Sequence, residues 1–504
     1  MFESIFNIRS ARRKTTENHF HANVEQLEDR QLLAGDVSVA LAGETLEITG
    51  DDANNRVEIV SDGSFITVEG QGTDLNGSDS SLTFAIGAVR NFAIDLGDGS
   101  DRITMIAENA IGATSAIGFG GTAGGNLSIL TGDGNDRITL IAENSTGLGF
   151  NMDMDFDSGS GNDRLLFEAN NTGGGGFAGE QFVVVSGQGN DRLEFIANNT
   201  GTLGFLPYNL GLDTGGGNDQ VLFEANNSTS LFGLSTVGFR IGDPLGGGGI
   251  FSDLWLVVTG NGNDRIHLEA NNDGNTTIGF EAVNVGFGTG EGNDRVTMVA
   301  NNSGLIGFEA ESAVISTEGG DDRISMVARN ASDSFAIGFH LTEKLGIESG
   351  NGRDRIDLTA QNKNGTGFQI LTPSVAPTAI DAFKIESGAD DDRVTIRARN
   401  RGNTFSSTGF LGLDFTFEGG SGDDRLQIRS DANNPDDGFA IIFDTDVDMG
   451  AGDDHVQLTA RDSFGIAFYD TVLFDGGTGT NDRLRVNNVP AVDPGAQINF
   501  EDTA

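Results

Sequence analysis

A motif built around an aspartate recurs thirteen times between residues 97 and 486, and a weaker copy lies at 55–59. The segments 132–144 and 292–302 show it best, because both run from glycine through Asn-Asp-Arg into alternating apolar residues. Most copies are 27 to 35 residues apart, with intervals of 45 before Asp264 and 38 before Asp392. Such a period is typical of repeats that bury a common core only by stacking. The anchoring residues are Asp101, Asp136, Asp163, Asp191, Asp219, Asp264, Asp294, Asp322, Asp354, Asp392, Asp424, Asp454 and Asp482.

Each copy predicts two turns and two strands. Glycine usually stands two and four positions before the aspartate, and its tolerance of positive φ predicts a tight turn. Apolar residues follow at two and four positions, as in Ile138 and Leu140, and this period of two predicts a strand with one buried face. An asparagine closes the strand, and a Gly-Phe pair opens a second extended stretch such as 150–156. The asparagines are Asn109, Asn144, Asn171, Asn199, Asn227, Asn272, Asn302, Asn330, Asn362 and Asn400, and the phenylalanines include Phe119, Phe150, Phe177, Phe205, Phe280, Phe308, Phe339, Phe368, Phe410 and Phe439.

The repeat therefore predicts an all-β fold, a parallel β-solenoid of about 13–14 coils of about 28–35 residues. Coils stacked at the strand spacing of ~4.8 Å would make a rod of about 60 Å. Equivalent residues would form columns: three internal ones of large apolar residues, alanine and phenylalanine, and one of asparagine amides bonded along the axis. A right-handed coil is the default for β-crossovers. The alternative is a large β-sandwich or a propeller, although propeller blades usually need about four strands and about 40 or more residues.

Composition narrows the possible partners. With 75 acidic and 30 basic residues in 504, the formal net charge is −45, which excludes nucleic acid and anionic membranes as expected partners because both are polyanions. The chain has no cysteine, so disulfides and thiolate metal sites are impossible. No apolar run approaches the length of a membrane helix, so we expect no membrane insertion. Oligomeric state is left open.

Four regions are expected along the chain. Residues 1–36 precede the repeat, 37–96 form a degenerate capping region, 97–486 form the solenoid and 487–504 form a C-terminal cap. The segment 27–33 reads Leu-Glu-Asp-Arg-Gln-Leu-Leu. It resembles the Leu-Glu-x-Arg-x-Leu-Leu segment near the N-terminus of large secreted planctomycete proteins. The resemblance implies a secreted or cell-surface protein; the alternative is an amphipathic N-terminal helix of a cytoplasmic one.

The glycine turn, clearest at 132–138, 187–193 and 260–266, is similar to the RTX or hemolysin-type nonapeptide Gly-Gly-x-Gly-x-Asp-x-apolar-x. In that family Ca²⁺ lies between stacked turns and is held by backbone carbonyls and the aspartate. The resemblance implies that the thirteen anchoring aspartates are calcium ligands, in keeping with the preference of calcium for oxygen donors. The chain departs from the family because it has one such turn per coil of about 28 residues, not one every nine.

Two other roles for the aspartates remain open. An arginine follows the aspartate in eleven copies, and a stacked arginine column could neutralise the aspartates without metal. Alternatively, the aspartates only cap the turns by accepting backbone N–H bonds. The arginines are Arg102, Arg137, Arg164, Arg192, Arg265, Arg295, Arg323, Arg355, Arg393, Arg425 and Arg483.

The sequence favours a structural or adhesive solenoid rather than an enzyme. Its expected partners are calcium and a cell-surface or matrix polysaccharide or protein. The competing functions are a polysaccharide-degrading β-helix enzyme and a metal-independent scaffold. An enzyme should show a cleft of non-repeat residues, and Trp255, in the longest insertion, marks where to expect it. His267, His340 and His455 are scattered and are expected to be solvated strand residues.

Overall fold

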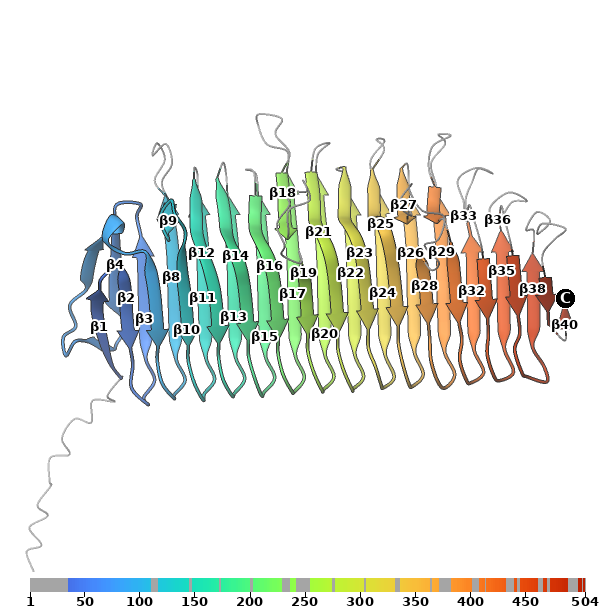
Figure 1. Cartoon of the computed structure of the whole chain (residues 1–504), viewed down its shortest axis with the longest axis horizontal. Coiled ribbons are helices and arrows are strands. Elements are labelled where there is room, and N and C mark those ends of the chain that lie inside the picture. The colour runs from blue at the N-terminus through green and yellow to red at the C-terminus, as the bar shows by residue number, and fades with distance from the viewer. Residues whose placement is uncertain are drawn as a thin grey trace, which may run out of the picture. The chain divides into compact units, whose positions relative to one another are not determined.

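Two parallel β-sheets face each other in the computed structural model, and each repeat contributes strands to both (Figure 1). The strands come from the alternating apolar positions, whose side chains form one continuous core between the sheets. The structure describes residues 35–109, 117–144, 147–171, 174–199, 203–228, 236–241, 254–273, 277–302, 305–330, 336–362, 365–370, 382–400, 408–412, 414–431, 439–441, 445–460, 466–468, 472–487, 497–500 and 502–503.

Sheet 1 holds the strand that follows each glycine turn. Neighbouring strands pair in parallel without slippage, so that Arg137, Ile138 and Leu140 lie beside Arg164, Leu165 and Phe167. Its parallel strands are β3 (Arg56–Ser61), β8 (Arg102–Asn109), β11 (Arg137–Asn144), β13 (Arg164–Asn171), β15 (Arg192–Asn199), β17 (Gln220–Ser228), β20 (Arg265–Asp273), β22 (Arg295–Asn302), β24 (Arg323–Asn330), β26 (Arg355–Asn362), β29 (Arg393–Asn400), β32 (Arg425–Ser430), β35 (His455–Ala460), β38 (Arg483–Asn487) and β40 (Asp502–Thr503).

Sheet 2 holds the return strand of each coil. Its strands are β2 (Thr45–Thr49), β7 (Asn91–Asp95), β9 (Ile117–Phe119), β10 (Gly125–Leu130), β12 (Leu148–Asp157), β14 (Gly175–Val185), β16 (Leu203–Asp213), β18 (Thr236–Ile241), β19 (Leu254–Val258), β21 (Thr277–Gly288), β23 (Ile306–Ser316), β25 (Ile337–Glu348), β27 (Thr366–Ile370), β28 (Phe383–Glu386), β30 (Thr408–Gly412), β31 (Phe415–Glu418), β33 (Phe439–Ile441), β34 (Thr445–Asp448), β36 (Ile466–Phe468), β37 (Val472–Asp475) and β39 (Gln497–Asn499).

The parallel β-solenoid is thus confirmed, and the sandwich and propeller alternatives are wrong. The weak copy at 55–59 is a true coil, because β3 pairs in register with β8 from Arg56 and Arg102 onward. Insertions also change the return strands of some coils. The two longest insertions split a sheet 2 strand into β18 and β19, and another into β27 and β28; both halves still pair with the neighbouring coils.

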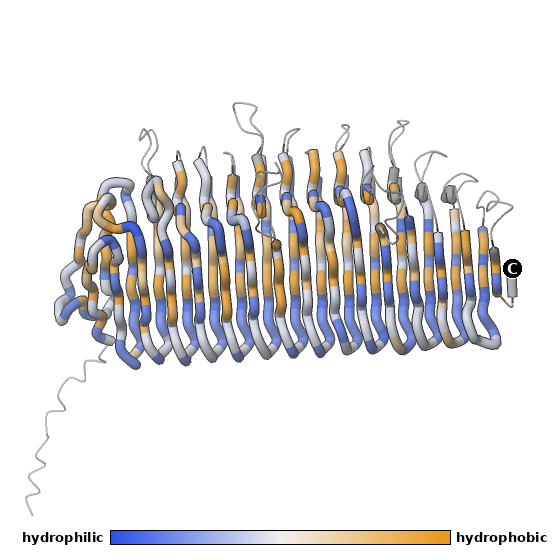
Figure 2. Tube along the Cα trace, in the orientation of Figure 1, coloured by the Kyte–Doolittle hydropathy of each residue, from blue (hydrophilic) through white to orange (hydrophobic). Residues whose placement is uncertain are grey.

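The expected internal columns are present. Figure 2 shows hydrophobic and hydrophilic positions alternating along the strands, with hydrophilic turns along the lower edge. Phenylalanines of sheet 2 from Phe119 to Phe410 stack with ring centroids 4.5–4.9 Å apart. Phe239 belongs to this column as well, while the side chain of Phe439 lies outside the described residues. The spacing of the rings follows that of the strands because one ring comes from each coil.

Six strand-closing asparagines also form the expected column. The amides of Asn171, Asn199 and Asn227 each donate to the Oδ1 of the asparagine one coil further on, at 3.1–3.3 Å. All six also donate to a backbone carbonyl of the return strand in the following coil, which ties sheet 1 to sheet 2. They are Asn171, Asn199, Asn227, Asn272, Asn302 and Asn330, each 1–3% exposed. The side chains of Asn109, Asn144, Asn362 and Asn400 lie outside the described residues.

Short strands finish both ends of the stack. At the N-terminal end, β1 (Asp36–Ala42) pairs antiparallel with β2, and β4 (Phe65–Gly70) pairs antiparallel with β3 and β6 (Leu82–Ala85). The two-residue β5 (Asp74–Leu75) pairs with β1, and a short 3₁₀ helix η1 spans Ile86–Ala88. At the other end, β39 and β40 add three and two residues to the sheets. Short terminal strands limit edge-to-edge association. No helix in the described part of the chain is long and apolar enough to cross a membrane.

Candidate functional site

All thirteen anchoring aspartates come together in one column inside the solenoid, which we call the aspartate column. Each is the last residue of its glycine turn, and its side chain is 0–3% exposed. Its Oδ1 accepts the backbone N–H of the equivalent residue one coil earlier at 2.7–2.9 Å, beginning with Asn55 N–H to Asp101. The carboxyl group thus takes the place of a backbone carbonyl in the ladder. This is turn capping by the aspartate, extended from one coil to the next.

A second column beside the aspartates was not predicted. A serine or threonine stands five positions before the aspartate in nine coils, and every one of these side chains is fully buried. The Thr214 hydroxyl donates to Asp219 Oδ2 at 2.7 Å, and the Ser349 hydroxyl donates to the Ser387 carbonyl of the next coil at 3.0 Å. The sequence did carry the signal, as a hydroxyl residue before the first residue of the turn. The nine residues are Thr131, Ser158, Ser186, Thr214, Thr259, Thr289, Thr317, Ser349 and Ser387.

Burial raises the pKa of the twelve column aspartates from Asp101 to Asp454. It brings the pKa of Asp191 and Asp264 to about 7 and that of Asp392 to about 8, whereas the accepted backbone N–H bond acts in the opposite direction. In eleven of the thirteen, Oδ2 is buried and has no hydrogen-bond partner among the described residues. A desolvated oxygen of this kind disfavours the charged form. Near neutral pH the column is therefore partly protonated, and the formal charge of −45 overstates the charge of the folded chain.

The arginines that follow the aspartates do not neutralise them. They stack in register in sheet 1, but consecutive strand residues face opposite sides, so the arginines point outward. The Arg164 and Arg192 side chains are 44% and 47% exposed, and both pair with Glu194 at 2.7 Å. Among the described residues no ion pair joins the two columns. The Asp-Arg ladder suggested by the sequence is wrong for this reason.

Many of the oxygens that calcium would need are engaged in other bonds, although Oδ2 of eleven column aspartates is not. Calcium takes about six to eight oxygen ligands. Here Oδ1 of each aspartate accepts a backbone N–H, and turn carbonyls such as Ser160 O and Gln188 O accept the N–H of Gly134 and Gly161 at 2.7 Å. The described residues contain no group of three or more His, Asp or Glu side chains placed to hold a metal ion. Calcium binding by the column stays a prediction, and the column has a structural role that needs no metal.

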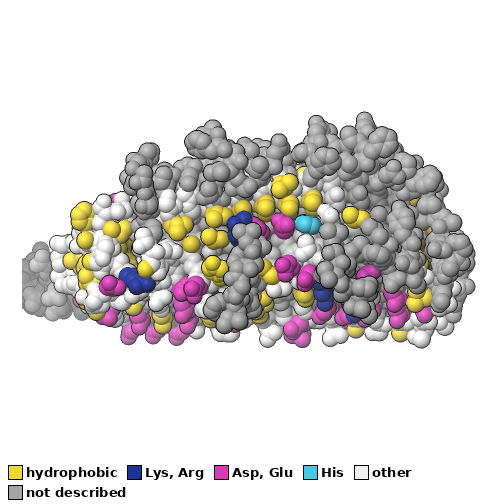
Figure 3. All heavy atoms as spheres, turned by 45° about the horizontal axis from the view of Figure 1, so that its top comes forward, with side chains coloured by type: hydrophobic (Ala, Val, Ile, Leu, Met, Phe, Trp, Pro, Cys, Tyr) yellow, Lys and Arg dark blue, Asp and Glu magenta, His cyan; other side chains and the backbone are white. Residues whose placement is uncertain are grey.

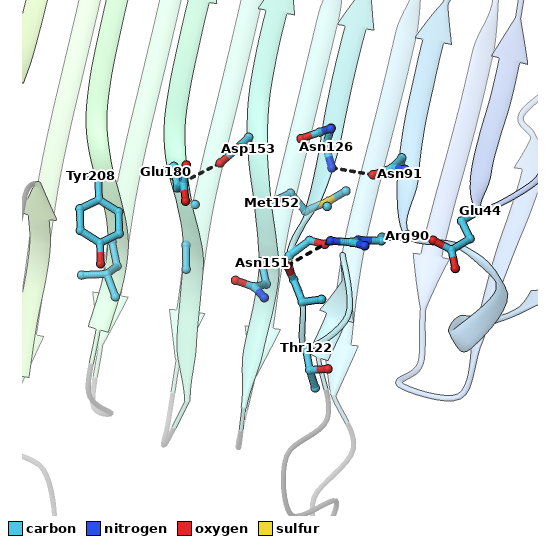
Figure 4. A pocket seen from close by; sticks show the side chains of 16 residues that line it. Glu44, Arg90, Asn91, Thr122, Asn126, Asn151, Met152, Asp153, Glu180 and Tyr208 are labelled. Carbon is cyan, nitrogen blue, oxygen red and sulfur yellow. Dashed lines mark hydrogen bonds between the residues drawn. The ribbon is translucent and has the colours of Figure 1, made fainter. Parts of the chain in front are cut away.

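A groove of about 590 Å³ crosses the outer face of sheet 2 near the N-terminal end (Figure 4). Its side chains come from the chain around β7, β10, β12, β14 and β16, and they include Arg90, Asn126, Asp153, Glu180 and Tyr208. None belongs to a repeated column. The repeat motif did not predict this site, because the residues that line it lie outside the positions of the motif.

Trp255 does not mark a site. It is 1% exposed and packs edge-to-face on Phe223 at 4.9 Å and face-to-face with Phe280 at 5.6 Å. The cavity beside it measures only about 20 Å³ and has an almost wholly apolar lining. A large ring on the buried face of β19 simply joins the aromatic core. Residues 242–253 of the same insertion lie outside the described part of the chain.

The three histidines among the described residues also show no sign of a site. His267 Nε2 lies 3.4 Å from Glu269 Oε2, and His340 Nδ1 lies 3.3 Å from Glu309 Oε1, each on a sheet face. His455 occupies an arginine position of sheet 1, beside Arg425 and Arg483. Burial and these two neighbouring cations hold its pKa below the usual range.

No protein-family model matches this sequence, and no curated protein matches it. The fold and its sites therefore carry the functional argument.

Substitution of one aspartate of the column should show whether it stabilises the fold by accepting a hydrogen bond or through its charge. We expect Asp191→Ala to destabilise the protein by about 1–3 kcal/mol, because the Asp163 N–H loses its buried acceptor. Asp191→Asn keeps an acceptor oxygen of the same shape and should cost far less. The free energy of unfolding from urea titrations at pH 7 measures both, and equal losses for the two variants would contradict the capping role.

The raised pKa values also set a pH dependence. The folded carboxyls bind more protons than the unfolded ones above their ordinary pKa of 3.8, so unfolding releases protons. Stability should be greatest near pH 4 and should fall as the pH rises through 6–8, where the folded groups lose their protons. Melting temperatures of the natural chain and Asp191→Asn at pH 5 and 8 test this. The melting temperature of the variant relative to that of the natural chain should be higher at pH 8 than at pH 5. The same difference in melting temperature at both pH values would refute the argument.

Proposed function

We propose that the chain is a secreted or cell-surface structural β-solenoid that holds its shape without bound metal. The supporting observation is the continuity of the inward-facing columns, above all of the aspartate column, which links fourteen consecutive coils from Asn55 to Asp482 without a break. A catalytic site inside such a stack would interrupt these columns. Uniform coils suit a rigid element that presents its outer faces to other molecules.

Melting the full chain in EDTA and in millimolar calcium tests the metal-independent role. A ligand that binds only the folded state stabilises it by about 2.7 kcal/mol at a hundred times its Kd. We expect the same melting temperature in both buffers, with magnesium as the control cation. If calcium raised the melting temperature of the natural chain but not of the triple variant Asp136→Asn, Asp163→Asn, Asp191→Asn, the aspartates would be calcium ligands and this part of the proposal would fail.

Export rests on the segment 27–33, which precedes the described residues. Fusing residues 1–36 to a reporter enzyme in a planctomycete cell tests it directly. The reporter should leave the cytoplasm, and a fusion carrying Leu32→Asp and Leu33→Asp should remain inside. Retention of the unmodified fusion in the cytoplasm would contradict a secreted or surface location.

A further inference from the structure

We infer that the groove on sheet 2 binds an uncharged polysaccharide chain. The inference builds on the proposed surface role and names a chemical class for the partner. It depends on the shape of the groove, on the side chains that line it and on its charge, and none of these involves the aspartate column.

The shape of the groove suits a linear polymer. It crosses five neighbouring strands, β7, β10, β12, β14 and β16, which at ~4.8 Å per strand corresponds to about 19 Å along the solenoid axis. The strands pair with neighbours on both sides, so the groove lies on a sheet face and not at an edge. An extended peptide adding as a further strand is therefore a poor occupant.

The backbone makes the hollow. Gly125 and Gly179 lie in it, and a Cβ on either would fall 2.1 Å from a carbonyl oxygen, that of Arg90 or Met152. The register between β12 and β14 also shifts between Asn151 and Met154. Close backbone approach thus keeps this part of the groove free of side chains.

The lining presents polar groups, two of which are held by hydrogen bonds. Arg90 donates to the Gly124 and Ala123 carbonyls at 2.6 and 3.2 Å, and Asp153 Oδ1 accepts the Glu180 N–H at 2.6 Å (Figure 4). The side chains of Asn126 and Glu180 are exposed and make no hydrogen bond within the described residues. Amide and carboxylate groups of this kind recognise sugar hydroxyls, and because their neighbours are already held, little ordering is needed on binding.

Tyr208 supplies an aromatic surface at one end. Its side chain is 46% exposed, although most large apolar side chains of the described residues are buried. Figure 4 shows its ring broadside at the end of the line of groove residues. An exposed ring of this type stacks on the apolar face of a sugar while its hydroxyl remains wet.

Charge selects against an anionic polymer. The groove contains Glu44, Asp153 and Glu180 against Arg90, a formal sum of −2. Acidic side chains also recur along the lower edge of the face in Figure 3, whereas lysine and arginine side chains appear at separate points above that edge. Uronate or sulfated chains would be repelled, whereas an uncharged chain would not.

Calorimetric titration of the full chain with hexasaccharides of glucose, mannose and xylose tests the inference, with hexagalacturonate as the anionic control. At least one neutral hexasaccharide should bind, and Tyr208→Ala and Asn126→Ala should each weaken binding about tenfold. Tyr208→Phe should bind nearly as well as the natural chain because it keeps the ring. The matched control is Leu256→Ala, which removes a side chain 38% exposed on β19 outside the groove, and it should have no effect.

Three outcomes would overturn the inference: no neutral hexasaccharide binds at millimolar concentration, only hexagalacturonate binds, or the groove variants bind like Leu256→Ala. The result is separable from the proposed function, which is tested by export and by melting without any sugar. New reducing ends on incubation with the bound sugar would keep the groove assignment and replace the structural role with an enzymatic one.

Discussion

Gly161→Ala should disrupt the stack at its third glycine turn and cost more than about 4 kcal/mol, which is exceptional for a single substitution. Gly161 has φ +147°, a conformation nearly restricted to glycine, and an added Cβ would lie 1.3 Å from the Gly134 carbonyl oxygen. The two turns would have to separate, which breaks the bond from Gly134 N–H to Ser160 O. Because each coil contacts only its neighbours, we expect the array to unfold in two parts.

Gly211→Ala is the matched control, because its added Cβ meets no atom within 4 Å. It should change stability by no more than about 0.5 kcal/mol. Urea titrations combined with hydrogen exchange along the chain would show both the loss in Gly161→Ala and its position. If both variants kept the natural midpoint, the turns would not be as tightly stacked as the structure has them.

Phe205→Ala should cost about 3–5 kcal/mol. The ring is 2% exposed and lies between Phe177 and Phe239, with both centroids 4.7 Å away and the planes within 7° of parallel. The coils above and below are held by backbone ladders, so they cannot close the cavity left by the ring.

Phe205→Leu is the comparison, because it keeps most of the buried volume and should lose much less stability. The free energy of unfolding from denaturant titration measures both changes. A loss below about 1 kcal/mol for Phe205→Ala would mean that the phenylalanine column is not an important part of the core.

The repeat motif was sufficient to predict the fold. Apolar residues at two and four positions after Asp136 and Asp163 fix which face of each strand is buried, and the recurrence of the same motif at the start of each strand fixes the register. The stacking of Asn171 on Asn199 and of Phe177 on Phe205 follows from that register alone. The serine and threonine column was predictable on the same grounds, since Thr131 and Ser158 hold equivalent positions.

Other features could not be predicted from the motif. The sequence places Asp136 next to Arg137, and such a pair can lie together in a turn or on opposite faces of a strand; the strand here begins at the arginine, which separates them. The groove depends on outward-facing residues such as Asn126, Glu180 and Tyr208, which lie outside the positions of the motif. Their proximity comes from the stacking of five coils and from the register shift between β12 and β14.

The sequence by itself determined the coil, its register and the identity of the internal columns. A periodic pattern of apolar residues is buried in every coil only when equivalent residues of neighbouring coils stack on one another. Only the tertiary structure decided that the aspartates point inward and lose water, since burial depends on what the adjacent coils place around each carboxyl group. The same holds for the groove, whose shape and chemistry exist only where particular coils meet.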